Sequence, residues 1–247
     1  MKGICNLSVI PIRKQPSSTS EMVSQLLFGD TYRILEHQGA WVAIVTDYDN
    51  YPGFINEQQL CMLTDTDVNI TWLVNTQYPF LTIQTDAGNL FVPAGCNIPA
   101  STPFQIGSTS YANLQEQCTY NQTHISQIAN QYLHVPYLWG GKTPFGIDCS
   151  GFTQMVFKQC GLTLLRDAYQ QAEQGIAVAF VEETQPGDLA FFDNMEGRIT
   201  HVGIMLNNQQ IIHASGKVRI DVLDHYGIMN HDTGQYSHKL RIIKRLF

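Results

Sequence analysis

"GIDCSGFTQMVFKQCGL", residues 146–162, places a cysteine between an acid and a serine at the point where an apolar helical pattern begins. Apolar residues recur at helical spacing after Cys149, and Gly161 is suited to end the helix. The first turn of a helix has unpaired N–H groups and the positive end of the dipole, which favour a thiolate. The stretch therefore predicts a reactive cysteine at a helix N-terminus. The alternative is a helix capped by Asp148 and followed by a small, buried cysteine.

The composition is that of an ordinary globular protein. The chain has 247 residues, of which 44% are hydrophobic and 14% are charged, and this length accommodates one large domain or several small ones. The formal net charge is −7, and no cluster of Lys and Arg is visible. These features argue against nucleic acid or an anionic membrane as the main partner.

The sequence also bears on localisation and on the cysteines. No stretch reaches the roughly eighteen apolar residues that a membrane helix requires. The apolar run at the N-terminus is short and interrupted, which is atypical of a signal peptide. We therefore expect a cytoplasmic protein, or a secreted one whose leader has been removed. The six cysteines are widely spaced without a C-x-x-C pair, so neither a disulfide framework nor a structural zinc site is predicted.

Turn signals and β-branched residues divide the first half of the chain into short strands. Runs such as TYRILEH and WVAIVTD, separated by Gly, Asp and Asn, predict a small β-barrel over residues 1–60. The pattern stays β-like over residues 61–115, where we expect a second, divergent barrel or a β-rich linker. A polar stretch at about 107–123 has the composition of a linker.

The pattern changes in the last region, residues 116–247. Helical segments come first, at THISQIANQYLHV, at the Cys149 helix and at LRDAYQQAE. Strand segments follow, namely GDLAFFDN, ITHVGIML, QQIIHAS and HKLRIIKRLF. Helices followed by an antiparallel sheet predict an α+β fold for this region.

Two histidines on neighbouring predicted strands complete a possible catalytic set with Cys149. A thiolate nucleophile needs a base, and the base needs a group that orients its ring. A lone histidine on a strand is normally structural, but His201 and His213 both follow a cysteine at a helix N-terminus. The remaining histidines, His238 among them, have no motif support and are interpreted as surface or loop residues.

The length of the turn between the two strands decides whether the histidines can meet. A two-residue turn at 207–208 would place the two imidazoles on opposite faces of the sheet. A three-residue loop at 207–209 pairs His213 with Gly203 and places it diagonal to His201 on one face. Catalysis therefore predicts an odd-length loop, such as the three-residue one, or a bulge, with Gly203 leaving room beside the pair.

Several motifs in a fixed order resemble the NlpC/P60 family of cysteine peptidases. They are PYLWGG (136–141), DCSGF (148–152), RDAYQQ, PGDLAFF, HVGI and IIHASG. This resemblance extends from about residue 123 to the C-terminus. The LLFGD turn, the WV.I strand and NYPGFI resemble bacterial SH3-like domains. Together the chain is similar to the dipeptidyl-peptidase VI type, the γ-D-glutamyl-L-diamino acid endopeptidases.

The resemblance implies a papain-like catalytic domain preceded by one or two SH3-like barrels. It assigns Cys149 as nucleophile, His201 as general base and His213 as the group that orients the base. The substrate-binding residues that it implies are Asp148, Ser150, Tyr51, Glu21, Arg166, Asp167 and Trp139. No metal and no cofactor is expected.

Individual substrate contacts follow from the same resemblance. Asp148, Glu21 and the Tyr51 hydroxyl are expected around a free α-amine, which needs acceptors and anions. Arg166 is expected at the substrate carboxylate, although Ala168 stands where relatives often have serine. Trp139 is expected as a wall of the cleft.

The implied reaction is hydrolysis of the γ-D-glutamyl–L-diamino acid bond in murein peptides that have a free N-terminal L-Ala, for cell-wall peptide recycling. The expected partner is this small murein peptide, with no nucleic acid and no membrane. Two alternatives stay open. One is an amidase or acyltransferase on the same Cys-His-His site, and the other is a catalytically inactive murein-binding module.

Overall fold

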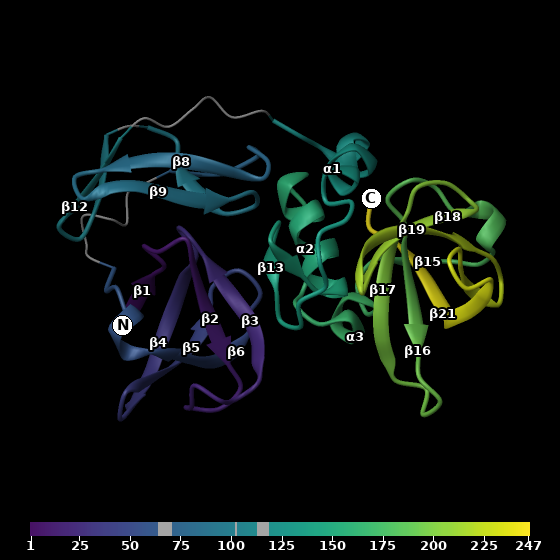
Figure 1. Cartoon of the computed structure of the whole chain (residues 1–247), viewed down its shortest axis with the longest axis horizontal. Helices are drawn as coiled ribbons and strands as arrows, with labels where there is room; N and C mark the ends of the chain where they lie inside the picture. Colours follow the sequence, from purple (N-terminus) through teal and green to yellow (C-terminus); the bar gives the residue numbers. More distant parts are fainter. Residues whose placement is uncertain (64–70, 102, 113–118) are drawn as a thin grey trace. The chain divides into compact units, whose positions relative to one another are not determined.

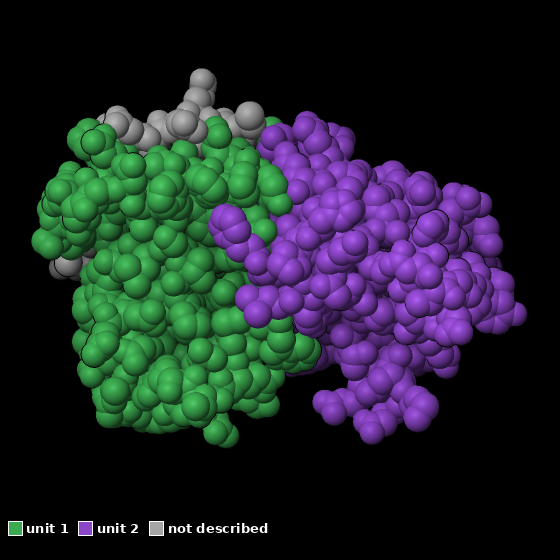
Figure 2. Space-filling model, in the orientation of Figure 1, with its two compact units in different colours: residues 1–119, 139–144 green, residues 120–138, 145–247 purple. Residues whose placement is uncertain are grey.

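The structure is a computed structural model that describes residues 1–63, 71–101, 103–112 and 119–247 (Figure 1). The chain forms two compact units (Figure 2). The first consists of Met1–Thr119 and Trp139–Pro144, and the second of Tyr120–Leu138 and Phe145–Phe247. Among the described residues, no helix is both long enough and apolar enough to span a bilayer.

The first unit begins with a six-stranded antiparallel sheet in the order β1-β4-β5-β6-β2-β3. Its strands are β1 (Lys2–Ile4), β2 (Val9–Arg13), β3 (Met22–Leu27), β4 (Thr31–Gln38), β5 (Trp41–Thr46) and β6 (Pro52–Asn56), followed by the 3-10 turn η1 (Glu57–Gln59). Apolar residues alternate with polar ones along these strands and meet in one core that includes Ile10, Tyr32 and Ile44. The strands predicted at TYRILEH and WVAIVTD are β4 and β5.

Two smaller sheets complete the first unit. One pairs β7 (Trp72–Val74) with β10 (Asn97–Pro99). The other has β8 (Phe80–Thr85), β9 (Gly88–Pro93), β11 (Phe104–Ile106) and β12 (Thr109–Ala112). The predicted boundary at 115/116 and linker residues 113–118, with Cys118, lie outside the described residues, and the three-part domain division stays a prediction.

The second unit contains a seven-stranded antiparallel sheet in the order β15-β21-β16-β17-β18-β19-β20, and β20 also pairs with β21. The strands are β15 (Ile176–Val178), β16 (Leu189–Asp193), β17 (Ile199–Met205), β18 (Gln210–Ser215), β19 (Lys217–Leu223), β20 (Gly227–Asn230) and β21 (Gln235–Arg245). The sequence pattern did not predict β19 and β20. Two short strands, β13 (Lys142–Thr143) and β14 (Gly146–Ile147), precede the second helix.

The helices of the second unit are α1 (Ile125–Gln131), α2 (Cys149–Gln159) and α3 (Ala168–Gln171), with 3-10 turns η3 (Gln122–His124) and η4 (Val181–Glu183). Helices followed by an antiparallel sheet confirm the α+β prediction. Helix α2 is buried along its whole length and packs against β17 and β18 (Figure 1). It ends at Gln159, and Gly161, directly after the C-cap residue, has a φ of 77° in the left-handed region that favours glycine. This packing holds the start of α2 against the strands that carry both predicted catalytic histidines.

Candidate active site

The hairpin of β17 and β18 has the register that catalysis predicts. Gly203 pairs with His213 across residues 207–209, and His201 Nε2 lies 2.8 Å from His213 Nδ1. A Cβ atom at Gly203 would lie 2.8 Å from His213 Cβ and 2.7 Å from Ile211 Cδ1. Only glycine therefore allows His213 its place beside His201. The prediction of a three-residue loop is confirmed.

Cys149 lies against the backbone on both sides of His201. It is the first residue of α2 and is 6% exposed. Its Sγ is 4.0 Å from the Thr200 carbonyl oxygen, and the backbone N–H groups of Val202 and Ser150 act to lower the pKa of the thiol. The structure thus brings Cys149, His201 and His213 together.

An acid that the sequence pattern did not single out holds the far side of His213. His213 Nε2 lies 3.0 Å from Oδ2 of Asp221 on β19. Arg219 donates to both oxygens of Asp221, at 2.6 and 2.9 Å, and the His231 N–H donates to Oδ1 at 2.9 Å. The available signal was the R-x-D alternation in the segment after Gly216, which places Arg219 and Asp221 on one face of a strand.

These contacts determine which nitrogen of each imidazole carries a proton. A carboxylate only accepts hydrogen bonds, so His213 carries its proton on Nε2 and donates it to Asp221. His213 Nδ1 then accepts from Nε2–H of His201. Nδ1 of His201 is left with a lone pair that can take the thiol proton. The tautomers are assigned here from the hydrogen-bond pattern.

Burial opposes a charge on both Cys149 and His201. Burial, followed by the charge of Asp148, raises the pKa of the Cys149 thiol to about 12. Burial, followed by the charges of His213 and His238, lowers the pKa of His201 well below its usual value. The helix N-terminus favours a thiolate, and this desolvation acts in the opposite direction. The thiol therefore loses its proton to His201 during the reaction.

His238 is not the surface or loop residue that the sequence predicted. It lies on β21, is half-buried, and its ring stacks on that of His201 with centroids 4.1 Å apart at 24°. Burial, with a smaller effect of His213, lowers the pKa of His238 to about 4. His238 is therefore neutral at pH 7 and takes up a proton only as the pH falls toward 4, where its charge opposes the protonation of His201.

The three histidines are also a possible metal-binding group, although the sequence predicted no metal. One ring nitrogen from each of His201, His213 and His238 lies within 4.8 Å of the others, and imidazole suits zinc or copper. Both nitrogens of His213 are already hydrogen bonded, to His201 and Asp221. A metal ion would have to displace the bond that orients the base.

Three of the predicted substrate-binding residues form a buried network beside the nucleophile. Arg166 is 1% exposed and donates to both oxygens of Asp148, at 2.6 and 3.1 Å. It also donates to Ser150 Oγ at 2.9 Å. Asp148 accepts from the Gly151 N–H at 2.6 Å and so caps α2. Asp148 is thus both the cap and the partner of a buried cation.

Asp167 lies at the start of the next helix. It is half-buried at the N-cap position of α3, where its N–H donates to Gln170 Oε1 at 3.0 Å. Its contact with substrate stays a prediction.

The other predicted substrate-binding residues belong to the first unit. Trp139 Nε1 donates to Glu21 Oε1 at 2.8 Å, and Lys14 Nζ donates to Glu21 Oε2 at 3.0 Å. The Lys14 and Trp139 hydrogen bonds lower the pKa of Glu21. The Trp139 segment is also tied to β3, because the Lys142 N–H donates to Gln25 Oε1 at 2.7 Å. Tyr51 is half-buried, and its N–H donates to Thr46 Oγ1 at 2.8 Å.

Comparisons with known proteins agree with this geometry. Residues 134–237 match the NlpC/P60 family, and residues 12–60 match the bacterial dipeptidyl-peptidase SH3 domain. The chain is 29% identical over 227 residues to the γ-D-glutamyl-L-lysine dipeptidyl-peptidase of Bacillus subtilis, covering 77% of this chain and 71% of the relative. It is 25% identical over 259 residues to dipeptidyl-peptidase 6 of Lysinibacillus sphaericus, covering 91% and 92%.

A solved structure shares the fold. The crystal structure of an NlpC/P60 family protein from Bacillus cereus superposes with a TM-score of 0.81 at 21% identity, covering 99% of each chain. The papain-like α+β domain and the preceding SH3-like barrel are confirmed. The chain thus combines an NlpC/P60 peptidase domain with a bacterial dipeptidyl-peptidase SH3 domain.

Proposed function

We propose that this peptidase hydrolyses the γ-D-glutamyl–L-diamino acid bond of small murein peptides that have a free N-terminal L-Ala, through a thioester on Cys149. The observation that carries the proposal is the position of Cys149 Sγ against the backbone next to His201, together with the hydrogen bonds that run from His201 through His213 to Asp221. The relatives named γ-D-glutamyl-L-lysine dipeptidyl-peptidase and dipeptidyl-peptidase 6 support the substrate class. Such a reaction would serve the recycling of cell-wall peptides in the cytoplasm.

The first half of the reaction forms the thioester. His201 Nδ1 takes the proton from Cys149 Sγ as the sulfur attacks the γ-glutamyl carbonyl carbon. The negative charge that develops on the carbonyl oxygen is stabilised by backbone N–H groups at the start of α2, among them that of Cys149. The C–N bond then breaks, and the protonated His201 gives its proton to the departing amine of the diamino acid.

The second half releases the dipeptide. His201, neutral again, takes a proton from water, and the hydroxide attacks the thioester carbon. The C–S bond breaks, and the sulfur recovers the proton from His201. The His213–Asp221 pair keeps the ring of His201 in one orientation throughout and stabilises its charged form. Each group returns to its starting protonation state.

The recognition of a free α-amine is the finer part of the proposal. Glu21, Tyr51 and Asp148 supply the anions and acceptors that an ammonium group needs. A substrate whose alanine nitrogen is acylated would leave such partners unsatisfied, which is costly. We therefore propose that stems still attached to muramic acid are poor substrates.

The test compares L-Ala-γ-D-Glu-L-Lys with its N-acetylated form, and follows the release of lysine by chromatography. We expect the free peptide to be cleaved with a kcat/KM on the order of 100-fold higher or more. Cys149→Ala should abolish cleavage, and mass spectrometry of the wild-type enzyme should detect the dipeptidyl thioester. Cys160→Ala, a change at the other end of the same helix, is the control and should stay active.

Each outcome bears on a different part of the proposal. Equal cleavage of the free and acetylated peptides would show that the enzyme does not recognise the free amine. The assignment as a peptidase would be unaffected. Full activity of Cys149→Ala would contradict the thioester mechanism.

A further inference from the structure

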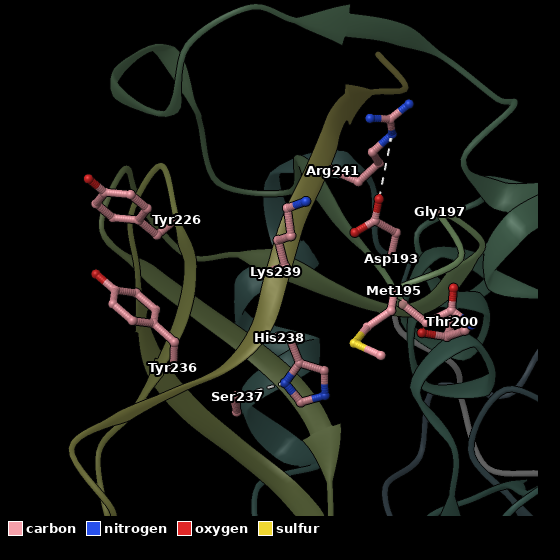
Figure 3. Close-up of a pocket in the computed structure, with 11 residues that line it drawn as sticks. Asp193, Met195, Gly197, Thr200, Tyr226, Tyr236, Ser237, His238, Lys239 and Arg241 are labelled. Atoms are coloured by element: carbon pink, nitrogen blue, oxygen red, sulfur yellow. Dashed lines mark hydrogen bonds and ion pairs between the residues drawn. The ribbon is translucent and has the colours of Figure 1, made fainter.

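An open pocket lies next to the catalytic base in the second unit. Its volume is about 1100 Å³, and its walls come from the β16–β17 turn, from the segment before β20 and from β21 (Figure 3). The pocket reaches the active site at two residues. Thr200 and His238 both line the pocket. The carbonyl oxygen of Thr200 is 4.0 Å from Cys149 Sγ, and the ring of His238 stacks on that of His201.

One wall of the pocket carries a carboxylate with an unsatisfied oxygen. The side chain of Asp193 is 5% exposed, and its Oδ2 lies 3.8 Å from Arg241 Nε. Within the described part of the chain, Oδ1 of Asp193 is buried and has no hydrogen-bond partner. A buried carboxylate oxygen without a donor is costly, and such groups in native proteins normally have a partner. A ligand with a cationic donor would satisfy it.

The neighbouring strand supplies the opposite charge. Lys239 and Arg241 both lie on β21 and both line the pocket, and in Figure 3 Lys239 lies beside Asp193 while Arg241 is joined to it by the dashed line. Lys239 pairs in register with Asp193 across the β16–β21 ladder. The pocket thus offers an anion and a cation close together, which matches a ligand with both charges.

The position of the pocket relative to His201 indicates which part of a substrate it would take. In the proposed reaction, His201 gives a proton to the departing amine, so the residue attached to that amine lies on the side of His201. His238 and Thr200 connect this side to the pocket. The network of Asp148, Ser150 and Arg166 lies at the start of α2 and does not line the pocket.

Resting on the proposed function, we propose that this pocket binds the leaving diamino acid, with Asp193 accepting from its side-chain ammonium and Lys239 pairing with its carboxylate. A diamino acid carries both charges, and its methylene chain separates them. An apolar leaving residue of the same length would leave Asp193 Oδ1 without a donor. The pocket would therefore select for a distal ammonium group.

The test uses two tripeptides, L-Ala-γ-D-Glu-L-Lys and L-Ala-γ-D-Glu-L-norleucine, which differ in the terminal ammonium. We expect the wild-type enzyme to prefer the lysine peptide by roughly tenfold or more in kcat/KM, the effect of one hydrogen bond to a charged group. Asp193→Asn should bring the ratio close to one by slowing only the lysine peptide. Glu196→Gln also replaces an acid by its amide, in the turn between β16 and β17, but Glu196 does not line the pocket. This control variant should keep the wild-type ratio.

A second arm tests the carboxylate. Amidation of the lysine carboxylate should reduce kcat/KM severalfold in the wild-type enzyme, and Lys239→Gln should remove this difference. Equal cleavage of the lysine and norleucine peptides by the wild-type enzyme would overturn the proposal, whatever the folding of the variants. An unchanged ratio in a folded Asp193→Asn would also overturn it. Failure of the wild-type enzyme to cleave either peptide would instead contradict the proposed function, and this inference would fall because it rests on that function.

Discussion

At the scale of single residues, Asp221 decides what His201 can do. Its carboxylate is buried on β19, and burial alone would raise its pKa. The hydrogen bonds from His213, Arg219 and the His231 N–H outweigh burial and hold the pKa of Asp221 well below its usual value. A permanent anion at this point forces the proton of His213 onto Nε2. It thereby leaves the Nδ1 lone pair of His201 available for the thiol proton.

Asp221→Asn should lower kcat by about 10²–10⁴-fold with little change in KM. The oxygen of the new amide should stay where Oδ1 is, because Arg219 donates to both positions whereas the His231 N–H, fixed in the backbone, donates to Oδ1. Its NH₂ group would then face His213 Nε2 and reverse both tautomers, so that His201 presents an N–H to the thiol. Steady-state kinetics on the lysine tripeptide measures the effect.

Asp232→Asn is the matched control for this change. Asp232 also accepts from Arg219, at 2.8 Å, but its side chain is 67% exposed, so its removal should leave kcat nearly unchanged. Full activity in a folded Asp221→Asn would show that Asp221 does not determine the tautomer.

His238→Gln should move the acidic limb of kcat/KM to higher pH. His201 must be neutral to accept the thiol proton, so activity is present above its pKa and is lost as the pH falls through it. Burial, His213 and His238 all lower that pKa. Removal of His238 removes one of these effects and raises the pKa of His201. A pH–rate profile from about pH 4 to 8 measures the shift.

His231→Gln serves as the control for the pH profile. Its side chain is 84% exposed, so its loss should leave the acidic limb where it is. A limb that stays in place, or moves to lower pH, in His238→Gln would contradict the influence of His238 on the base.

At the scale of elements, the start of α2 combines a helix cap with a buried ion pair. Asp148 accepts from the Gly151 N–H and from Arg166, which is 1% exposed. Removal of one partner of a buried pair leaves an uncompensated charge, whereas removal of both is much less costly. The stability of this helix start therefore depends on the pair more than on the cap.

Asp148→Ala should lower the free energy of unfolding by about 3–5 kcal/mol. The double variant Asp148→Ala/Arg166→Met should recover a large part of this loss, because no unpaired guanidinium stays buried. Urea unfolding followed by circular dichroism measures both. Asp167→Ala, at the N-cap position of α3, provides a comparison without a buried pair and should cost about 0.5–2 kcal/mol. Equal stability of the single and double variants would contradict the explanation.

At the scale of the whole molecule, the predicted substrate-binding residues are divided between the two units. Glu21, Tyr51 and Trp139 belong to the first, whereas Asp148, Ser150, Arg166 and Asp167 belong to the second with the catalytic set. Glu21 is already held by Lys14 and Trp139. An anion oriented in this way is suited to an ammonium group.

Glu21→Gln should reduce the preference for the free over the N-acetylated tripeptide by about tenfold, because the amide keeps the shape but loses the charge that attracts an ammonium group. The ratio of kcat/KM for the two peptides is the measurement. Glu36→Gln, an exposed change on β4 of the same unit, is the control and should leave the ratio unchanged. An unaltered ratio in Glu21→Gln would restrict Glu21 to its contacts with Lys14 and Trp139.

Local patterns account for much of the fold and for the three catalytic residues. The apolar spacing after Cys149 determines where α2 begins, and Gly161 determines where it ends. The period-two alternation of β17 and β18, with the length of their loop, determines that His201 and His213 share a face. These features depend on residues close in the chain, so they can be predicted from the sequence.

Only the tertiary structure decided the rest, because it depends on residues far apart in the chain. Asp221 reaches His213 through the pairing of β19 with β18, and His238 reaches His201 because β21 returns to pair with β16. The protonation state of Cys149 was decided in the same way. The helix start that the sequence specifies favours a thiolate, but the packing of α2 against the sheet removes water from the sulfur. That desolvation is a property of the assembled core and raises the pKa of the thiol.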